Sequence, residues 1–144
     1  MNKRKKKPYY RLILIRFLIL NMVIPNPAAF AVTIEVDHSA DVSHRATLDE
    51  AQNKVPIVNI SAPSTGGVSK NKFNHYNVGS EGVIINNSTQ IGRSQLGGVV
   101  FQNPNLKGQT AKIALFEVSG AMPSSLEGFT ELFGDKAEFI LANP

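Results

Sequence analysis

The chain has 144 residues, a formal net charge of +4 and no cysteine, so it cannot be stabilised by disulfides. Seven of its 15 basic residues lie within residues 1–31, whereas all 11 acidic residues lie within residues 32–144. Residues 32–144 therefore have a formal charge of −3. This reversal removes the compositional support for nucleic-acid binding.

Residues 1–31 have the organisation of a secretory signal peptide. A basic segment, MNKRKKKPYYR, precedes the apolar run LILIRFLILNMVI, and PNPAAFA ends in the small residues Ala29 and Ala31. The alternative is an uncleaved membrane anchor, but a spanning helix needs about 20 apolar residues. This run is shorter and contains Arg16. We expect the general secretory machinery to export the chain, cleavage after Ala31, and no stable membrane span afterwards.

The first part of the exported chain contains two predicted strands, residues 32–36 and 56–63, because both are rich in β-branched residues. Residues 37–55 are polar and predict a linker or surface loop, with a weak helical tendency at TLDEAQ. Residues 64–82 are dense in Gly, Ser and Asn and predict a turn-rich connection, with one extended piece at KFNHYNV.

Short apolar runs recur in the second part of the chain and predict five further strands: residues 83–86, 98–101, 112–118, 129–133 and 137–142. No segment has a convincing helical period, which indicates an all-β protein. A sandwich, a barrel and a β-helix all fit this pattern. Consecutive apolar residues within brief strands favour the β-helix, as do connections rich in asparagine, whose side chains can stack between successive coils.

Two Asn-Pro motifs each follow a predicted strand: Asn103-Pro104-Asn105-Leu106 and Asn143-Pro144. Proline removes a backbone donor and ends the strand, and the preceding asparagine is driven towards extended backbone. Asn105 is expected in the left-handed conformation and Leu106 in the core. We interpret the first motif as a turn that closes a coil. A contact for a transporter is the alternative, compatible role.

Other candidate sites are weaker. The polar stretch with Asp37, His38, Asp41 and His44 has a spacing that suits no regular metal site, so we interpret it as a solvated loop. The motifs of nucleophilic or phosphate-binding enzymes are not found, and we expect no enzymatic activity, metal or cofactor. The clustered asparagines could contact sugars, but stacking within a solenoid is the preferred interpretation.

An ordered succession of small motifs extends from residue 55 to the last residue. Its members are Val58-Asn59-Ile60, Pro63, Gly67, Ser69, Asn71, Phe73, Tyr76-Asn77-Val78, Gly82, Asn86-Asn87, Leu96-Gly97-Gly98 and Asn103-Pro104-Asn105-Leu106, followed by the segments EVSG, SLEGFTELFG and AEFILANP. In this order they resemble the N-terminal secretion domain of filamentous haemagglutinin-type two-partner-secretion exoproteins. That family includes contact-dependent inhibition proteins.

The resemblance implies a right-handed parallel β-helix, a single-stranded solenoid with extra-helical strands, over residues 32–144. It implies a recognition module that the periplasmic domains of a dedicated outer-membrane transporter bind, and that nucleates the β-helix of a large adhesin or toxin. The product would reach the surface of a Gram-negative bacterium through the periplasm. The transporter-recognition or turn residues would be Asn103, Pro104, Asn105, Leu106, Asn143 and Pro144. The structural residues would be Asn59, Asn71, Phe73, Tyr76, Asn77, Asn86, Asn87, Gly97 and Gly98.

The family pattern continues beyond Pro144, so the resemblance also implies that the domain is incomplete at its C-terminus. We therefore expect residues 32–144 alone to be marginally stable or prone to aggregation. A glycan- or host-binding adhesin module is the main alternative, and it would need an exposed aromatic platform. An exported β-helical hydrolase is a further alternative, and it would need converging carboxylates.

Overall fold

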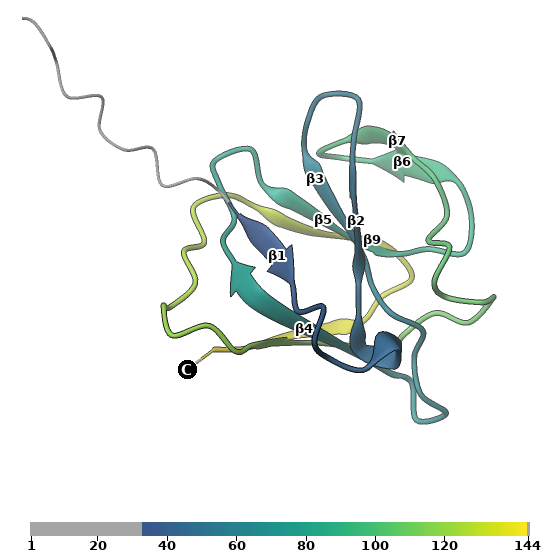
Figure 1. Cartoon of the computed structure of the whole chain (residues 1–144). Coiled ribbons are helices and arrows are strands. Elements are labelled where there is room, and N and C mark those ends of the chain that lie inside the picture. Colours follow the sequence, from purple (N-terminus) through teal and green to yellow (C-terminus); the bar gives the residue numbers. More distant parts are fainter. Residues whose placement is uncertain (1–32, 144) are drawn as a thin grey trace, which may run out of the picture. The chain divides into compact units, whose positions relative to one another are not determined.

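The computed structural model describes residues 33–143 (Figure 1). The predicted signal peptide and Pro144 lie outside the described residues. The described part contains ten strands, one turn of 3₁₀ helix (η1, Val42–His44) and no α-helix. None of its helical segments has the length and apolarity that crossing a membrane requires. The prediction of an all-β protein is confirmed.

Two four-stranded sheets form the body of the molecule. Sheet 1 contains, in spatial order, β1 (Ile34–Val36), β4 (Val68–Tyr76), β8 (Ile113–Val118) and β10 (Glu138–Ala142). Sheet 2 contains β2 (Thr47–Glu50), β3 (Pro56–Asn59), β5 (Val83–Asn87) and β9 (Thr130–Gly134). The first strand of each sheet is antiparallel to its neighbour, and the remaining strands are parallel.

The chain passes alternately between the sheets, from β3 to β4, β5, β8, β9 and β10 (Figure 1). Each return places the new strand beside the previous strand of that sheet: Ile57 pairs with Ile84, and Ile84 with Glu131. A separate antiparallel hairpin, β6 (Gly92–Ser94) and β7 (Gly98–Val100), interrupts the path from β5 to β8. The two sheets therefore grow in parallel, one strand at a time.

An apolar core joins the two sheets. It includes Val58 and Ile85 from sheet 2 and Phe73 and Phe116 from sheet 1. The rings of Phe73 and Phe116 lie 4.9 Å apart, and Tyr76 meets Phe116 edge-on at 5.2 Å. Such pairs contribute about 0.5–1.5 kcal/mol beyond their area burial. This aromatic cluster is the contribution of sheet 1 to the core, because its rings lie on the neighbouring strands β4 and β8.

A second apolar cluster covers the opposite face of sheet 2. Ile57 and Ile84 contact Val100 of the hairpin and Phe133 of β9 within it. Strand β5 is consequently buried on both faces. This explains why its apolar residues are consecutive: Val83 and Ile85 face the core, whereas Ile84 faces the hairpin.

Two strands were not predicted from the sequence, and a third was predicted only in part. The longest strand, β4, includes most of the extended piece expected at KFNHYNV, but its first half was expected to be turns, because its inward residues Ser69 and Asn71 are polar. Strand β2 lies in the predicted linker, and the helical tendency there was wrong: all four residues are exposed, and the strand is defined by pairing with β3. Strand β6, Gly-Arg-Ser, has no strand-like composition.

Candidate functional site

The Asn-Pro turn (Asn103–Leu106) follows strand β7 and closes as predicted. The Leu106 amide donates to the Asn103 carbonyl at 3.5 Å, and Pro104 lies exposed between them. Leu106 is 1% exposed and belongs to the core that joins the sheets. The expected left-handed conformation of Asn105 was wrong. It occurs instead at Lys107 and Gly108, with φ of 51° and 86°, where a second turn follows directly.

The Asn103 side chain ties the turn to sheet 2. Its amide nitrogen donates to the carbonyl oxygens of Ile60, at 2.9 Å, and Asn86, at 2.8 Å. Its carbonyl oxygen accepts from the backbone amide of Asn105 at 2.8 Å. Since the residue is only 4% exposed, these bonds replace water at the ends of two adjacent strands, β3 and β5.

Asn59, Asn86 and Asn105 complete an asparagine cluster around that turn. Asn59 and Asn86 are register partners, and the Asn86 amide donates to the Asn59 side-chain oxygen at 2.8 Å. The Asn105 amide donates to the Asn59 carbonyl at 3.0 Å and to the Thr47 hydroxyl at 3.1 Å. Stacking between successive strands is thus confirmed for Asn59 and Asn86. The side chain of Asn103 bonds to the backbone, and that of Asn105 bonds to one backbone carbonyl and one hydroxyl.

Asn71 and Asn87 are buried at separate corners of the fold. The Asn71 oxygen accepts from the Ser61 amide at 2.8 Å, and its nitrogen donates to the Ser69 hydroxyl at 3.0 Å, which closes the bend between β3 and β4. Asn87 exchanges two bonds with Ala111, at 2.8 and 2.9 Å, on the approach to β8. Both residues therefore shape the passage between the sheets.

The remaining residues of the sequence prediction do not join the asparagine cluster. The Asn77 oxygen accepts from the Ser125 amide at 2.9 Å. Gly97 and Gly98 lie in the hairpin, where a Cβ on Gly97 would be 2.5 Å from the Ile84 side chain. Asn143 is exposed after β10. The predicted recognition set is therefore divided between one connected turn and a distant strand end.

Phe73 and Tyr76 belong to the aromatic core rather than to a surface. Tyr76 is 1% exposed, and its hydroxyl has no hydrogen-bond partner among the described residues. Burial raises the pKa of Tyr76 well above its ordinary value of 10.0. This tyrosine cannot provide the exposed aromatic platform that an adhesin module would need.

The acidic stretch before β2 binds its own neighbours. Asp37 accepts from the amide and hydroxyl of Ser39, at 2.8 and 2.6 Å, and Asp41 accepts from Ser43 in the same way. These bonds, led by the serine hydroxyls, lower the pKa of both carboxyls. Residues 33–143 contain no group of three or more acidic, histidine or cysteine side chains that could hold a metal ion.

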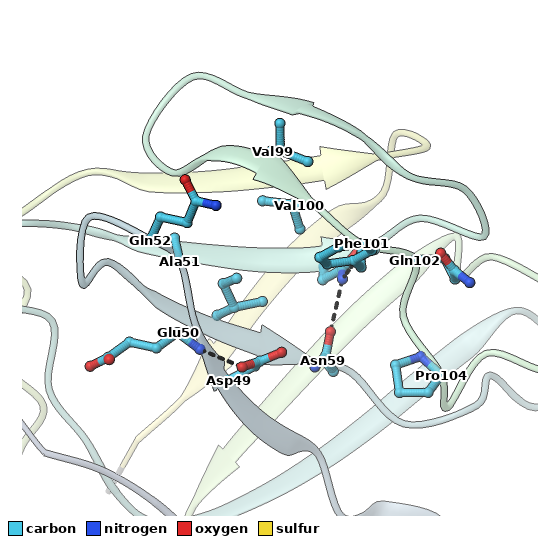
Figure 2. A pocket seen from close by; sticks show the side chains of 12 residues that line it. Asp49, Glu50, Ala51, Gln52, Asn59, Val99, Val100, Phe101, Gln102 and Pro104 are labelled. Carbon is cyan, nitrogen blue, oxygen red and sulfur yellow. Dashed lines mark hydrogen bonds between the residues drawn. The ribbon is translucent and has the colours of Figure 1, made fainter.

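A groove of about 560 Å³ lies beside the asparagine cluster (Figure 2). Ile57 and Asn59 of β3 line it, together with residues of β2 and of the chain that follows β7. Phe101 lines it and is 68% exposed. The groove places an exposed aromatic ring next to the Asn-Pro turn.

Comparison with known proteins identifies this arrangement. Residues 33–144 match the family model of the TPS secretion domain, where TPS denotes two-partner secretion. The chain belongs to this family. The crystal structure of the filamentous hemagglutinin secretion domain superposes on this TPS domain with a TM-score of 0.68 and 40% identity, over 77% of this chain and 35% of that chain.

Relatives of this TPS domain are much longer proteins. The 16S rRNA endonuclease CdiA of Enterobacter cloacae subsp. cloacae is 52% identical over 104 residues, which are 71% of this chain and 3% of the relative. The filamentous hemagglutinin of Bordetella pertussis is 41% identical over 130 residues, 85% of this chain and 4% of the relative. The resemblance seen in the sequence is thereby confirmed, including its contact-dependent inhibition branch.

Sequence reasoning missed two polar residues of the TPS domain. Ser61 donates its hydroxyl to the Lys70 carbonyl and accepts, at its own carbonyl, from the hydroxyl of Ser69, a residue that the resemblance had already included. Glu131 accepts hydrogen bonds from the hairpin tip more than 30 residues earlier. Serine and glutamate are ordinary surface residues, so only their burial and partners distinguish them.

Proposed function

We propose that this TPS domain is the export and nucleation module of a larger secreted protein. Periplasmic domains of a dedicated outer-membrane transporter would bind it while it is unfolded, and it would then fold at the cell surface of a Gram-negative bacterium. There it would form the first coils of a right-handed parallel β-helix on which the following chain folds. The module itself would have no catalytic activity.

The observation that carries this proposal is the pair of parallel ladders. Val68 of β4 pairs with Ile113 of β8, and Ile113 pairs with Glu138 of β10, while sheet 2 repeats the same order. A path that alternates between two growing parallel sheets is the path of a solenoid, in which each coil buries its apolar face against its neighbours. Strands β9 and β10 are the places where a further coil would add.

The burial of Asn103 supports recognition by the transporter before the domain folds. Both amide hydrogens of this residue are donated to the protein's own carbonyls, and its side chain is almost inaccessible. A partner that contacts this side chain must therefore meet the chain before it folds. An unfolded segment can bind by adding as a strand to an exposed sheet edge, through backbone hydrogen bonds.

The test is secretion of a reporter exoprotein that carries this domain, expressed with its transporter. We expect Asn103→Ala and Pro104→Ala each to lower the secreted fraction several-fold while synthesis stays normal. Because Pro104 is exposed in the folded domain, its effect would not come from a lost core contact. Immunoblots of the medium, the cell surface and the periplasm measure the distribution.

Matched controls are Pro123→Ala, an exposed proline in the loop before β9, and Asn74→Ala, whose side-chain amide bonds, within residues 33–143, to the exposed Glu35 carboxylate at 3.1 Å. Both should be secreted like the unmodified protein. Normal secretion of the Asn103 and Pro104 variants would refute a role of the Asn-Pro turn in recognition.

A direct glycan- or host-binding role has less support. The asparagines that could have contacted sugars donate their amides within the protein, and Tyr76 is buried. The groove offers the ring of Phe101 beside Asp49, Gln52 and Gln102, but one exposed ring is less than the aromatic platform that such a module would need. We therefore favour export and nucleation.

A further inference from the structure

The tip of the β6–β7 hairpin (Ser94–Gly97) forms hydrogen bonds with two separate parts of sheet 2, the loop between β2 and β3 and the strand β9. On one side, the Leu96 carbonyl accepts from the side-chain amide of Asn53 at 2.7 Å. Asn53 belongs to the loop that joins β2 to β3. On the other side, the Leu96 amide donates to the Glu131 carboxylate of β9 at 2.8 Å. One residue thus links the first strand pair of the sheet to its last strand.

Glu131 is the stronger of the two anchors. One carboxylate oxygen accepts from the Gln95 amide at 2.9 Å, and the other accepts from the Leu96 amide and, at 2.7 Å, from the Ser94 hydroxyl. The same hydroxyl accepts from the Gly97 amide at 2.9 Å. Hydrogen bonds to a charged acceptor are roughly twice as strong as neutral ones. The tip is therefore built around this carboxylate.

Apolar contacts support the same connection. Val100 of the hairpin packs in one cluster with Ile57 of β3, Ile84 of β5 and Phe133 of β9. Gly92 approaches the Phe133 ring so closely that an added Cβ would lie 3.0 Å from it. The hairpin thus touches three successive parallel strands, although it precedes β9 by some 30 residues in the chain.

We propose that the hairpin tip is a clamp, anchored by Glu131, that couples the ordering of strand β9 to the loop between β2 and β3. The hairpin cannot reach its final position until β9 has paired with β5, and β9 is held in place once the hairpin has closed. If the proposed nucleation function holds, the clamp keeps the edge of sheet 2 ordered for the next strand.

Hydrogen exchange of the full chain, read by mass spectrometry, tests the clamp. Asn53→Ala removes one neutral hydrogen bond and touches no atom of β9. We expect it to speed exchange at Leu96 and also in β9 by roughly two- to tenfold, as loss of a neutral bond allows. Strand β5, buried on both faces, serves as the internal reference.

Glu131→Ala removes the charged anchor, and exchange at Gln95 and Leu96 should rise on the order of tenfold or more. Glu138→Ala, an exposed glutamate on the edge strand β10, is the matched control and should leave the hairpin unchanged. Should Glu131→Ala fail to fold, Glu131→Gln and Asn53→Ala still test the clamp, since both variants retain most of the contacts between the hairpin and sheet 2.

Faster exchange in β9 upon Asn53→Ala supports the clamp. Faster exchange confined to the hairpin tip overturns the clamp, because the hydrogen bonds of the tip would then have no effect on the ordering of β9. Equal behaviour of the Glu131 and Glu138 variants also overturns it. The transporter is not present in this experiment, so a negative result leaves the secretion test of the proposed function unaffected, and the converse also holds.

Discussion

Within the part of the chain that the structure describes, the buried asparagines are hydrogen-bonded, whereas the buried hydroxyl of Tyr76 is not. Asn71 and Asn103 have both their donors and their acceptors engaged within the protein, so their burial costs little. The Tyr76 hydroxyl is buried without a partner among residues 33–143. An unsatisfied buried hydroxyl costs about 1–3 kcal/mol. The hydroxyl of Tyr76 therefore offsets part of the stabilisation that burial of its ring provides.

At the residue scale, we predict that Tyr76→Phe raises the free energy of unfolding by about 1 kcal/mol at neutral pH, because it keeps the ring and removes the unsatisfied group. Burial raises the folded pKa of Tyr76 above its ordinary value of 10.0, so this group leaves the stability independent of pH below about pH 10 and lowers it as the pH rises further, because only the unfolded chain ionises readily. Denaturant unfolding at neutral and alkaline pH measures both effects, and the variant should lose the alkaline component. A destabilised Phe variant would mean that the hydroxyl has a partner.

At the element scale, the strands differ in whether one face or both faces are buried. Strand β4 alternates between buried and half-exposed residues, whereas β5 is covered by the core and by the hairpin. The hairpin can lie this close because Gly97 has no side chain: a Cβ there would be 2.5 Å from Ile84 and 2.8 Å from Ala51. The docking of this element therefore depends on one glycine.

We predict that Gly97→Ala destabilises the domain by about 1–3 kcal/mol, the usual cost of overpacking a core. Gly66→Ala is the matched control, since its Cβ would meet only the Ser64 hydroxyl at 3.7 Å. Denaturant midpoints of both variants measure the difference. Equal midpoints would show that the hairpin does not pack tightly on sheet 2.

At the scale of the whole molecule, the parallel sheets have unpaired edges. Within the described residues β9 and β10 each pair on one side only. Phe129, just before β9, is 82% exposed, and Ile140 of β10 is 39% exposed. Unpaired edges with apolar side chains promote association between chains.

We predict that the 144-residue chain associates in a concentration-dependent manner, and that Ile140→Lys reduces this association because a charge blocks edge pairing. Val42→Lys, which changes a residue 74% exposed in η1, is the control away from these edges. Size exclusion with light scattering gives the molar mass, and circular dichroism checks the β content. A monomer at all concentrations, with cooperative unfolding, would contradict the prediction.

The sequence by itself determined the all-β class, seven of the strands, the turn at Asn103–Leu106 and the family, because these depend on local composition and on motif order. Only the tertiary structure decided that the polar segment 68–76 is the longest strand, since its inward Ser69 and Asn71 bond to Ser61 across the bend. It alone decided the role of Glu131, whose partners lie more than 30 residues away. Pairing and burial between distant segments leave no periodic signal in the sequence, and they determine what such polar residues do.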